Sequence, residues 1–316
     1  MANVVEVAEN IYMIDDRLYS IPQAGSVYFL DEDRKALVDT GPATSSQTVI
    51  EGIRQIGRKP ADISYIIISH IHLDHSGGVG TLLESMPQAE VVAHHKAVKH
   101  IVNPDKLVKS ALEAQGEEWM MMNGAVVPVD AHKVKPAVDG DKIPLGSNQV
   151  LTLLETPGHA PHELSIYESR NGGVFVGDAV AHHVAGTDIS VPITPPPSFD
   201  LDLYLGSLDK LMKLAAGRLY FAHFGVSDKV AEKIKLAVNE LKIRNEIIAR
   251  TVKENKTDMA AEMLLAHARA VLSPISETMK ELVDYWMNFD IPMSLREHVK
   301  YYLKNMNLVR ATGRAI

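Results

Sequence analysis

The sequence contains no cysteine among its 316 residues. This absence excludes disulfides, thiolate nucleophiles, iron–sulfur clusters and cysteine-based zinc fingers. Any metal site must therefore use histidine, carboxylate or other oxygen ligands. The chain has fourteen histidines, which makes such a site worth looking for.

Basic charge and long apolar stretches are also scarce. The 32 lysines and arginines are outnumbered by 40 aspartates and glutamates, which gives a formal net charge of −8. A chain without a broad basic surface is a poor general binder of nucleic acid or anionic membranes. No apolar run approaches the ~20 residues that span a bilayer, and the N-terminus shows no basic region followed by an apolar core. We therefore expect a soluble cytoplasmic protein with no nucleic-acid or membrane partner.

The pattern of residues 1–227 predicts strands separated by helices, with ordinary globular proportions of 46% hydrophobic and 23% charged residues in the whole chain. The run Ile63–Ser69 is continuously apolar and β-branched, which is typical of a strand buried on both faces. Residues 96–140 mix helical stretches and are interpreted as an insertion beside the core. The proline-rich residues 191–200 predict a rigid loop.

Beyond Ser227 the pattern becomes helical almost throughout, and we predict about four helices over residues 228–316. Ser294 and Glu297 have the spacing of a capping box, which predicts the start of the last helix. We therefore divide the chain into a catalytic domain, residues 1–227, and a C-terminal helical region, residues 228–316.

Metal-ligating side chains gather directly after the buried strand, in the segment Ser69-His70-Ile71-His72-Leu73-Asp74-His75. Side chains two residues apart on an extended backbone point to the same side, so His70 and His72 can bind one ion. Asp74 and His75 fall where the chain turns into a helix and can face a second ion. Four coordinating side chains in six positions at a strand end form a specific signal.

Three further candidates each stand where a strand or a tight turn ends. His159 follows the turn at Pro157-Gly158, Asp178 follows the strand Gly173–Gly177, and His223 follows the strand Leu219–Ala222. If Asp178 bridges two ions, each ion gains four ligands. The first ion is then held by His70, His72, His159 and Asp178, and the second by Asp74, His75, Asp178 and His223.

The H-x-H-x-D-H motif, followed by His, Asp and His in this order, resembles the metallo-β-lactamase superfamily over roughly residues 1–225. The resemblance implies an α/β fold, a four-layer αββα sandwich with a dinuclear site at one edge. The helical tail is similar in placement to that of glyoxalase II. The resemblance also implies that Asp39, at the end of an earlier strand, orients a ligand histidine. Relatives often pair, so a homodimer is compatible with it.

The ligand set indicates the chemistry. Imidazole and carboxylate suit zinc, and also iron or manganese. Two divalent ions ~3.5–4 Å apart can share a water and lower its pKa to ~7, so that a bridging hydroxide attacks a carbonyl. Asp74 can both ligate and receive the proton. We therefore expect a metal-dependent hydrolase acting on a small-molecule thioester, lactone or related carboxylic ester.

Two alternatives use the same ligands. A phosphodiesterase or ribonuclease-type activity is opposed by the net charge of −8. A di-iron redox protein is opposed by the helical pattern after residue 227, which shows no flavodoxin-like alternation, and by a histidine at position 72, where that branch typically has glutamate. Three further histidines, which lie near the ligand motifs in sequence, are candidates for the substrate pocket: His162, His182 and His183.

Overall fold

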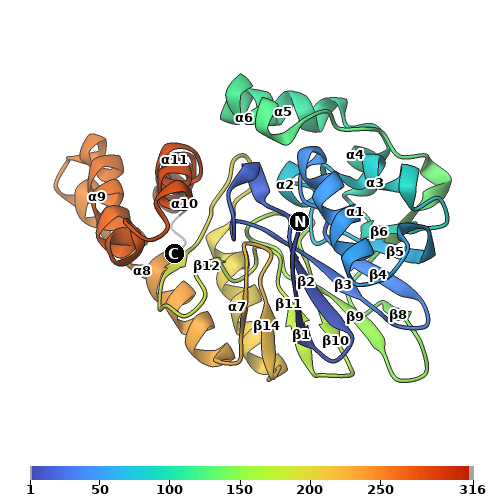
Figure 1. Ribbon diagram of the computed structural model, residues 1–316. Coiled ribbons are helices and arrows are strands. Elements are labelled where there is room, and N and C mark those ends of the chain that lie inside the picture. The colour runs from blue at the N-terminus through green and yellow to red at the C-terminus, as the bar shows by residue number, and fades with distance from the viewer. Residues whose placement is uncertain (1, 313–316) are drawn as a thin grey trace.

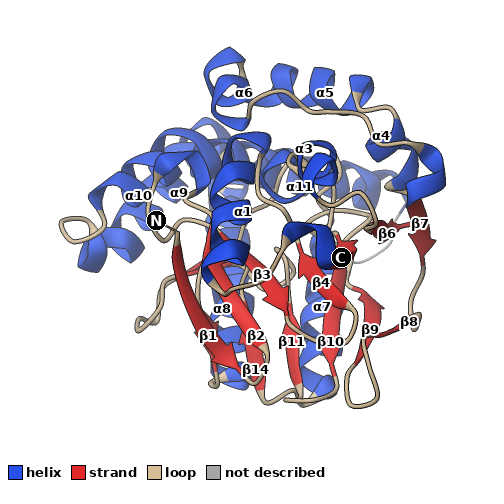
Figure 2. Cartoon of the chain, turned by 45° about the vertical axis from the view of Figure 1, so that its right-hand side comes forward, coloured by secondary structure: helices blue, strands red, loops and turns tan. Residues whose placement is uncertain are grey.

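The computed structural model describes residues 2–312, and side chains are described as far as residue 306. Two sheets lie face to face (Figures 1 and 2). The first has the strand order β1-β2-β3-β4-β5-β6-β7, with bounds Asn3–Ala8, Ile11–Asp15, Ser26–Leu30, Lys35–Val38, Ile63–Ile67, Glu90–His94 and Val134–Ala137. The second has the order β15-β14-β11-β10-β9-β8, with bounds, in chain order from β8, Lys142–Pro144, Val150–Glu155, Leu164–Glu168, Gly173–Phe175, Arg218–Tyr220 and Val226–Ser227.

Helices cover the outer face of each sheet. On the first sheet, α1 (Ser46–Gln55) and α3 (Val79–Ser85) share a buried apolar cluster with the strands. On the second, α7 (Leu201–Leu214) and α8 (Val230–Lys253) do the same. A third cluster fills the space between the sheets. The predicted four-layer αββα sandwich is therefore confirmed.

Strand β5 is apolar at every position except Ser64, because both of its faces are buried. Ile63, Ile66 and Ile68 pack toward α1 and α3, whereas Tyr65 and Ile67 pack between the sheets. Side chains alternate across a strand, so a strand with helices on one face and a sheet on the other buries both sets. The strand ends just before the histidine motif, which it holds at the edge of the sandwich.

The segment predicted to be an insertion, residues 96–140, forms α4 (Val98–Val102), α5 (Asp105–Gln115) and α6 (Glu117–Asn123), and then strand β7. Figure 1 shows α5 and α6 projecting above the sandwich. Strand β7 pairs in parallel with β6, so the end of the insertion completes the first sheet.

The C-terminal region contains α8 and then α9 (Ala260–Leu272), α10 (Lys280–Tyr285) and α11 (Ile291–Thr312), in agreement with the predicted four helices. A π-helical turn, Trp286–Asp290, joins α10 to α11. No helix within residues 2–312 is both long enough and apolar enough to cross a membrane. The division of the chain at residue 227 stays a prediction.

The predicted capping role of Ser294 is wrong, because α11 already begins at Ile291. The buried Ser294 hydroxyl accepts a hydrogen bond from the Thr194 backbone N–H at 2.8 Å, and the Thr194 hydroxyl donates to the Ser294 carbonyl at 2.7 Å. These contacts across the fold use the side chain that a cap would need. They fasten α11 to the proline-rich loop beside the site.

Candidate metal centre

The seven predicted ligands meet in one buried cluster at the sheet edge. His70 and His72 follow β5, Asp74 and His75 lie on the short helix α2 (Leu73–Ser76), and three loops after strands of the second sheet supply the others. The Asp74 side chain is the more open of the two aspartates, at 16% exposed against 5% for Asp178. Residues up to 153 positions apart, from 70 to 223, are thus brought together, as the sequence predicted.

Three imidazoles form the first group. The Nδ1 atom of His72 lies 2.9 Å from Nε2 of His70 and 2.9 Å from Nε2 of His159. Zn–N bonds of ~2.0–2.1 Å in a tetrahedral site would set such nitrogens about 3.3 Å apart. The His72 nitrogen therefore needs to separate from each of the other two by only a few tenths of an ångström for the group to hold one ion.

Asp74, His75 and His223 form the second group. The Oδ2 atom of Asp74 lies 3.7 Å from Nε2 of His75 and 3.6 Å from Nε2 of His223. Asp178 stands between the groups, with Oδ2 3.3 Å from His159 Nε2 and Oδ1 3.3 Å from His223 Nε2. One carboxylate thus contacts both groups, which is the arrangement that a bridging ligand requires.

Buried atoms without partners mark the cluster as a site for a cation. Within the described residues, no hydrogen bond reaches Nε2 of His75, Oδ1 of Asp178 or either ring nitrogen of His223. A buried polar atom left unsatisfied costs about 1–3 kcal/mol. Divalent ions would satisfy Nε2 of His75, Oδ1 of Asp178 and Nε2 of His223, the nitrogen of that ring which faces Asp74 and Asp178, so the residues present fit the metals that the sequence predicts.

The electrostatics of the cluster also favour positive charge. Burial lowers the pKa of His75, but the Asp74 and Asp178 carboxylates outweigh it and hold that pKa well above its usual range. Burial raises the pKa of Asp178, but His223, His159 and His75 hold it well below its usual range. Without metal, protons on imidazole therefore balance the carboxylates, so metal binding must release protons.

Hydrogen bonds hold two ligand histidines from behind. The Nδ1 atom of His75 donates to Oδ2 of Asp39 at 3.0 Å, and Ser69 donates to the same carboxylate from its backbone N–H and its hydroxyl. The Nδ1 atom of His159 donates to the carbonyl oxygen of Ile193 at 3.0 Å. Asp39 therefore stands where its predicted role, orienting a ligand histidine, requires it.

Glu163 was missed by sequence reasoning. Its buried carboxyl accepts a hydrogen bond from the Asp178 backbone N–H at 3.0 Å, and its other oxygen lies 3.3 Å from Nδ1 of His70. Burial and the nearby Asp178 raise the pKa of Glu163 well above its usual range. The only signal in the sequence is its place four residues after His159, a spacing that no general rule links to this role.

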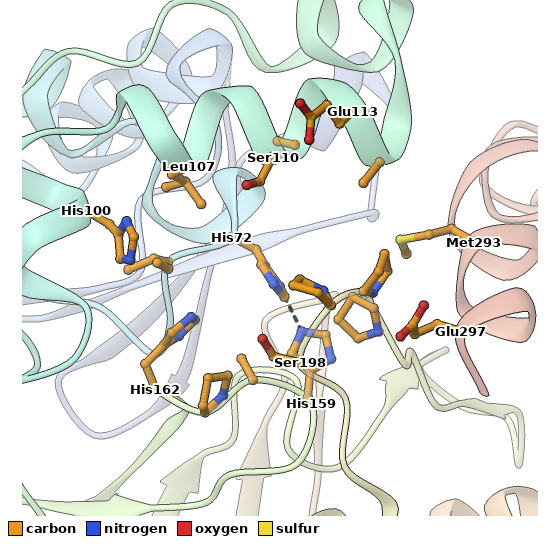
Figure 3. A pocket seen from close by; sticks show the side chains of 18 of the residues that line it. His72, His100, Leu107, Ser110, Glu113, His159, His162, Ser198, Met293 and Glu297 are labelled. Carbon is orange, nitrogen blue, oxygen red and sulfur yellow. Dashed lines mark hydrogen bonds between the residues drawn. The ribbon is translucent and has the colours of Figure 1, made fainter. Parts of the chain in front are cut away.

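Two adjoining cavities lead to the cluster. The outer one, of about 620 Å³, is lined by His72, His159 and His162 together with residues of α5 and α11 (Figure 3). The inner one, of about 80 Å³, is lined by Asp74, Asp178 and His182 and by apolar side chains. His162 and His182 thus lie at the predicted pocket.

His183 does not lie there. It lines neither of these two cavities, and its ring packs instead on Phe221 with ring centroids 4.5 Å apart. Neighbours on a strand point to opposite faces, and His182 and His183 form the short strand β12. Sequence alone could not say which of the two faces the site.

Replacing Asp39 tests whether its carboxylate orients His75 for metal binding. Replacing Asp39 with asparagine keeps an oxygen for Ser69 but turns an amide N–H toward His75, so we expect the affinity for the second ion to fall by ~10–100-fold. Isothermal titration of the metal-free protein with Zn²⁺ measures the change. The matched control is Asp62→Asn, an exposed aspartate away from the cluster. Unchanged zinc affinity in Asp39→Asn would show that Asp39 does not orient His75.

Comparison with known proteins places the fold and the site in a wider group. A family model described as the metallo-beta-lactamase superfamily matches residues 21–223, a range that includes all seven residues of the cluster. The metallo-beta-lactamase fold-containing protein ST1585 of Sulfurisphaera tokodaii is 30% identical over 192 residues, which cover 58% of this chain and 71% of that protein.

Two further matches extend the comparison. An N-acyl homoserine lactonase of a Bacillus species is 26% identical over 184 residues, which cover 58% of this chain and 63% of that protein. Among solved structures, the metallo-beta-lactamase family protein TTHA1429 of Thermus thermophilus aligns with a TM-score of 0.65 at 20% identity, over 95% of both chains. The last match concerns the fold alone, and it includes the helical C-terminal region.

Proposed function

Because the chain belongs to the metallo-beta-lactamase superfamily, we propose that it is a metal-dependent hydrolase of an ester-type bond, namely a thioester, a lactone or a related carboxylic ester. The observation that carries the proposal is the contact of Asp178 with both groups of ligands. The N-acyl homoserine lactonase among the relatives makes lactones the first class to test.

We propose two divalent ions, zinc in the first place and iron or manganese as alternatives. His70, His72 and His159 would hold one ion and Asp74, His75 and His223 the other, with Asp178 shared. When bound, such ions lower the pKa of a water and polarise a carbonyl oxygen. The donor set, imidazole and carboxylate without thiolate, is suited to all three metals.

The remaining steps fall to side chains of this chain. Asp74 lines the inner cavity and is the more exposed of the two carboxylates, so its carboxylate is placed to accept a proton from the attacking water. Asp39 holds His75 in place, and the Ser69 hydroxyl and Glu163 lie beside Nδ1 of His70. Leu107, Trp119 and Met293 give the inner cavity an apolar wall, which favours an apolar acyl group and keeps out bulk water.

Metal removal and a substrate panel test the proposal. The protein is stripped with a chelator, reloaded with Zn²⁺, Fe²⁺ or Mn²⁺, and assayed on thioesters, lactones, nitrocefin and a chromogenic phosphodiester. We expect hydrolysis of at least one ester-type substrate, its loss on chelation and its recovery on reloading. Circular dichroism of the stripped protein checks that the fold persists. Turnover that survives chelation, or cleavage of the phosphodiester alone, would overturn the proposal.

A further inference from the structure

His182 has a buried imidazole beside the cluster, but it is not one of the seven predicted ligands. It lies on β12, four residues after Asp178, and is only 2% exposed. Its Nε2 atom is 3.7 Å from Oδ2 of Asp178, and its ring stacks on that of His223 with centroids 3.6 Å apart. The ring therefore lies against His223 and near Oδ2 of Asp178, the oxygen that also faces His75 and His159.

Neither ring nitrogen of His182 has a hydrogen-bond partner within the described residues. Buried polar side chains nearly always have one, so both orphaned nitrogens need an explanation. Ligand atoms of Asp178, His182 and His223 all lie within 4.8 Å of one another, and rotation of the His182 ring out of its stack on His223 would turn a nitrogen toward an ion shared by the three. The Trp286 ring, 5.6 Å away between centroids, packs on His182 and helps to hold it against the cluster.

His183 provides the contrast within the same strand. It is also buried, at 4% exposed, but its ring packs on Phe221 and it belongs to no group of potential ligands within the described residues. Burial alone therefore does not bring a histidine of β12 to the cluster. The alternation of the strand selects His182 and turns it toward Asp178.

We propose that His182 is an eighth donor, directed to the ion that Asp74, His75 and His223 would hold. This inference rests on the proposed function only in requiring that the two ions bind. With Asp178 included, the second ion would have five protein donors, three imidazoles and two carboxylates, against four for the first. Zinc sites in proteins are commonly four-coordinate, so a fifth donor shifts the second site toward iron, manganese or cobalt, which accept five or six ligands.

Cobalt substitution tests this assignment without relying on catalysis. Metal-free wild-type protein, His182→Ala and the matched control His183→Ala are titrated with Co²⁺, and the visible absorption and the bound metal are measured. We expect His182→Ala to weaken the second equivalent of Co²⁺ by at least ~10-fold. The visible absorption per bound Co²⁺ ion should be stronger in His182→Ala than in the wild type, because cobalt absorbs more strongly when it has fewer ligands. His183→Ala should match the wild type in both affinity and absorption.

Controls distinguish the loss of a metal ligand from a loss of folding and from a failure of the proposed function. Circular dichroism and thermal unfolding of each metal-free variant confirm the fold, and His182→Gln serves as the second variant if alanine disturbs the packing against Trp286. Identical affinity and spectra in the wild type and the folded His182 variant would overturn the assignment, as would a change in KM with unaltered metal binding. Failure of the wild type to bind two ions would instead overturn the proposed function.

Discussion

Replacing Asp178 with alanine is expected to remove ester hydrolysis almost completely, by about 1,000-fold or more in kcat/KM. Partners that only orient a ligand are typically worth 10–100-fold in metal affinity or activity. Asp178 contacts His159 of the first group and His223 of the second, so its loss acts on both ions at once. The same change should lower the bound metal below two ions per chain, measured by elemental analysis after dialysis.

The fold should survive this change, because the structural contacts of Asp178 come from its backbone. Its N–H donates to Glu163, and its carbonyl accepts a hydrogen bond from the Tyr204 hydroxyl at 2.8 Å. Alanine preserves both contacts, but it removes the attraction of the Asp178 carboxylate for His223, His159 and His75, which outweighs the repulsion from Asp74. We therefore expect the metal-free variant to remain folded and to unfold cooperatively, at a lower temperature than the wild type.

Two companion variants sharpen the Asp178 test. Asp178→Asn keeps the shape of the side chain but removes its charge, so it should bind metal weakly and remain nearly inactive. Asp202→Ala, an exposed aspartate at the start of α7, should behave as the wild type. Wild-type turnover in Asp178→Ala with two ions bound would show that the bridge is not needed, and the proposed mechanism would fail.

The parts of the site that could be predicted are those fixed by local pattern. His70, His72, Asp74 and His75 are contiguous, and their positions follow from the end of the apolar strand β5. Order along the chain was enough to add His159, Asp178 and His223, because each ends a strand or turn whose pattern is visible. The residue pattern itself predicted strands separated by helices and then a helical tail, whereas the αββα layers followed from the family resemblance of the ligand motif.

The parts that could not be predicted depend on contacts between distant segments. Ser294 has a perfect capping spacing, but Thr194, a hundred residues earlier, takes its hydrogen bonds. His182 and His183 look equivalent until the pairing of β12 with β13 (Ser190–Val191) fixes which one faces Asp178. Asp290, in the π-helical turn before α11, lines the inner cavity although nothing in the sequence links it to residues 70–223.

Glu163 is the clearest example of a site residue that the sequence could not reveal. Its replacement by alanine should strongly affect both the stability of the protein and its affinity for metal. The alanine variant leaves the buried Asp178 N–H without its acceptor, which should lower the free energy of unfolding by about 1–3 kcal/mol. It also removes the carboxyl beside His70 Nδ1, so the affinity for the first ion should fall by ~10–100-fold. Urea unfolding and zinc titration measure the two effects separately.

Glutamine at position 163 distinguishes the two roles. Its oxygen can accept from Asp178 or lie beside His70, but its NH₂ group then faces an N–H at the other contact, so one of the two contacts is lost in either orientation. If the glutamine oxygen accepts the hydrogen bond from Asp178, Glu163→Gln should keep the wild-type free energy of unfolding, while its affinity for the first ion should still be reduced. The second ion is the internal control, because Asp39 and His75 do not contact Glu163 through any hydrogen bond of the described residues. An equal loss of affinity for both ions would mean that Glu163 acts by holding Asp178, the shared ligand, rather than by orienting His70.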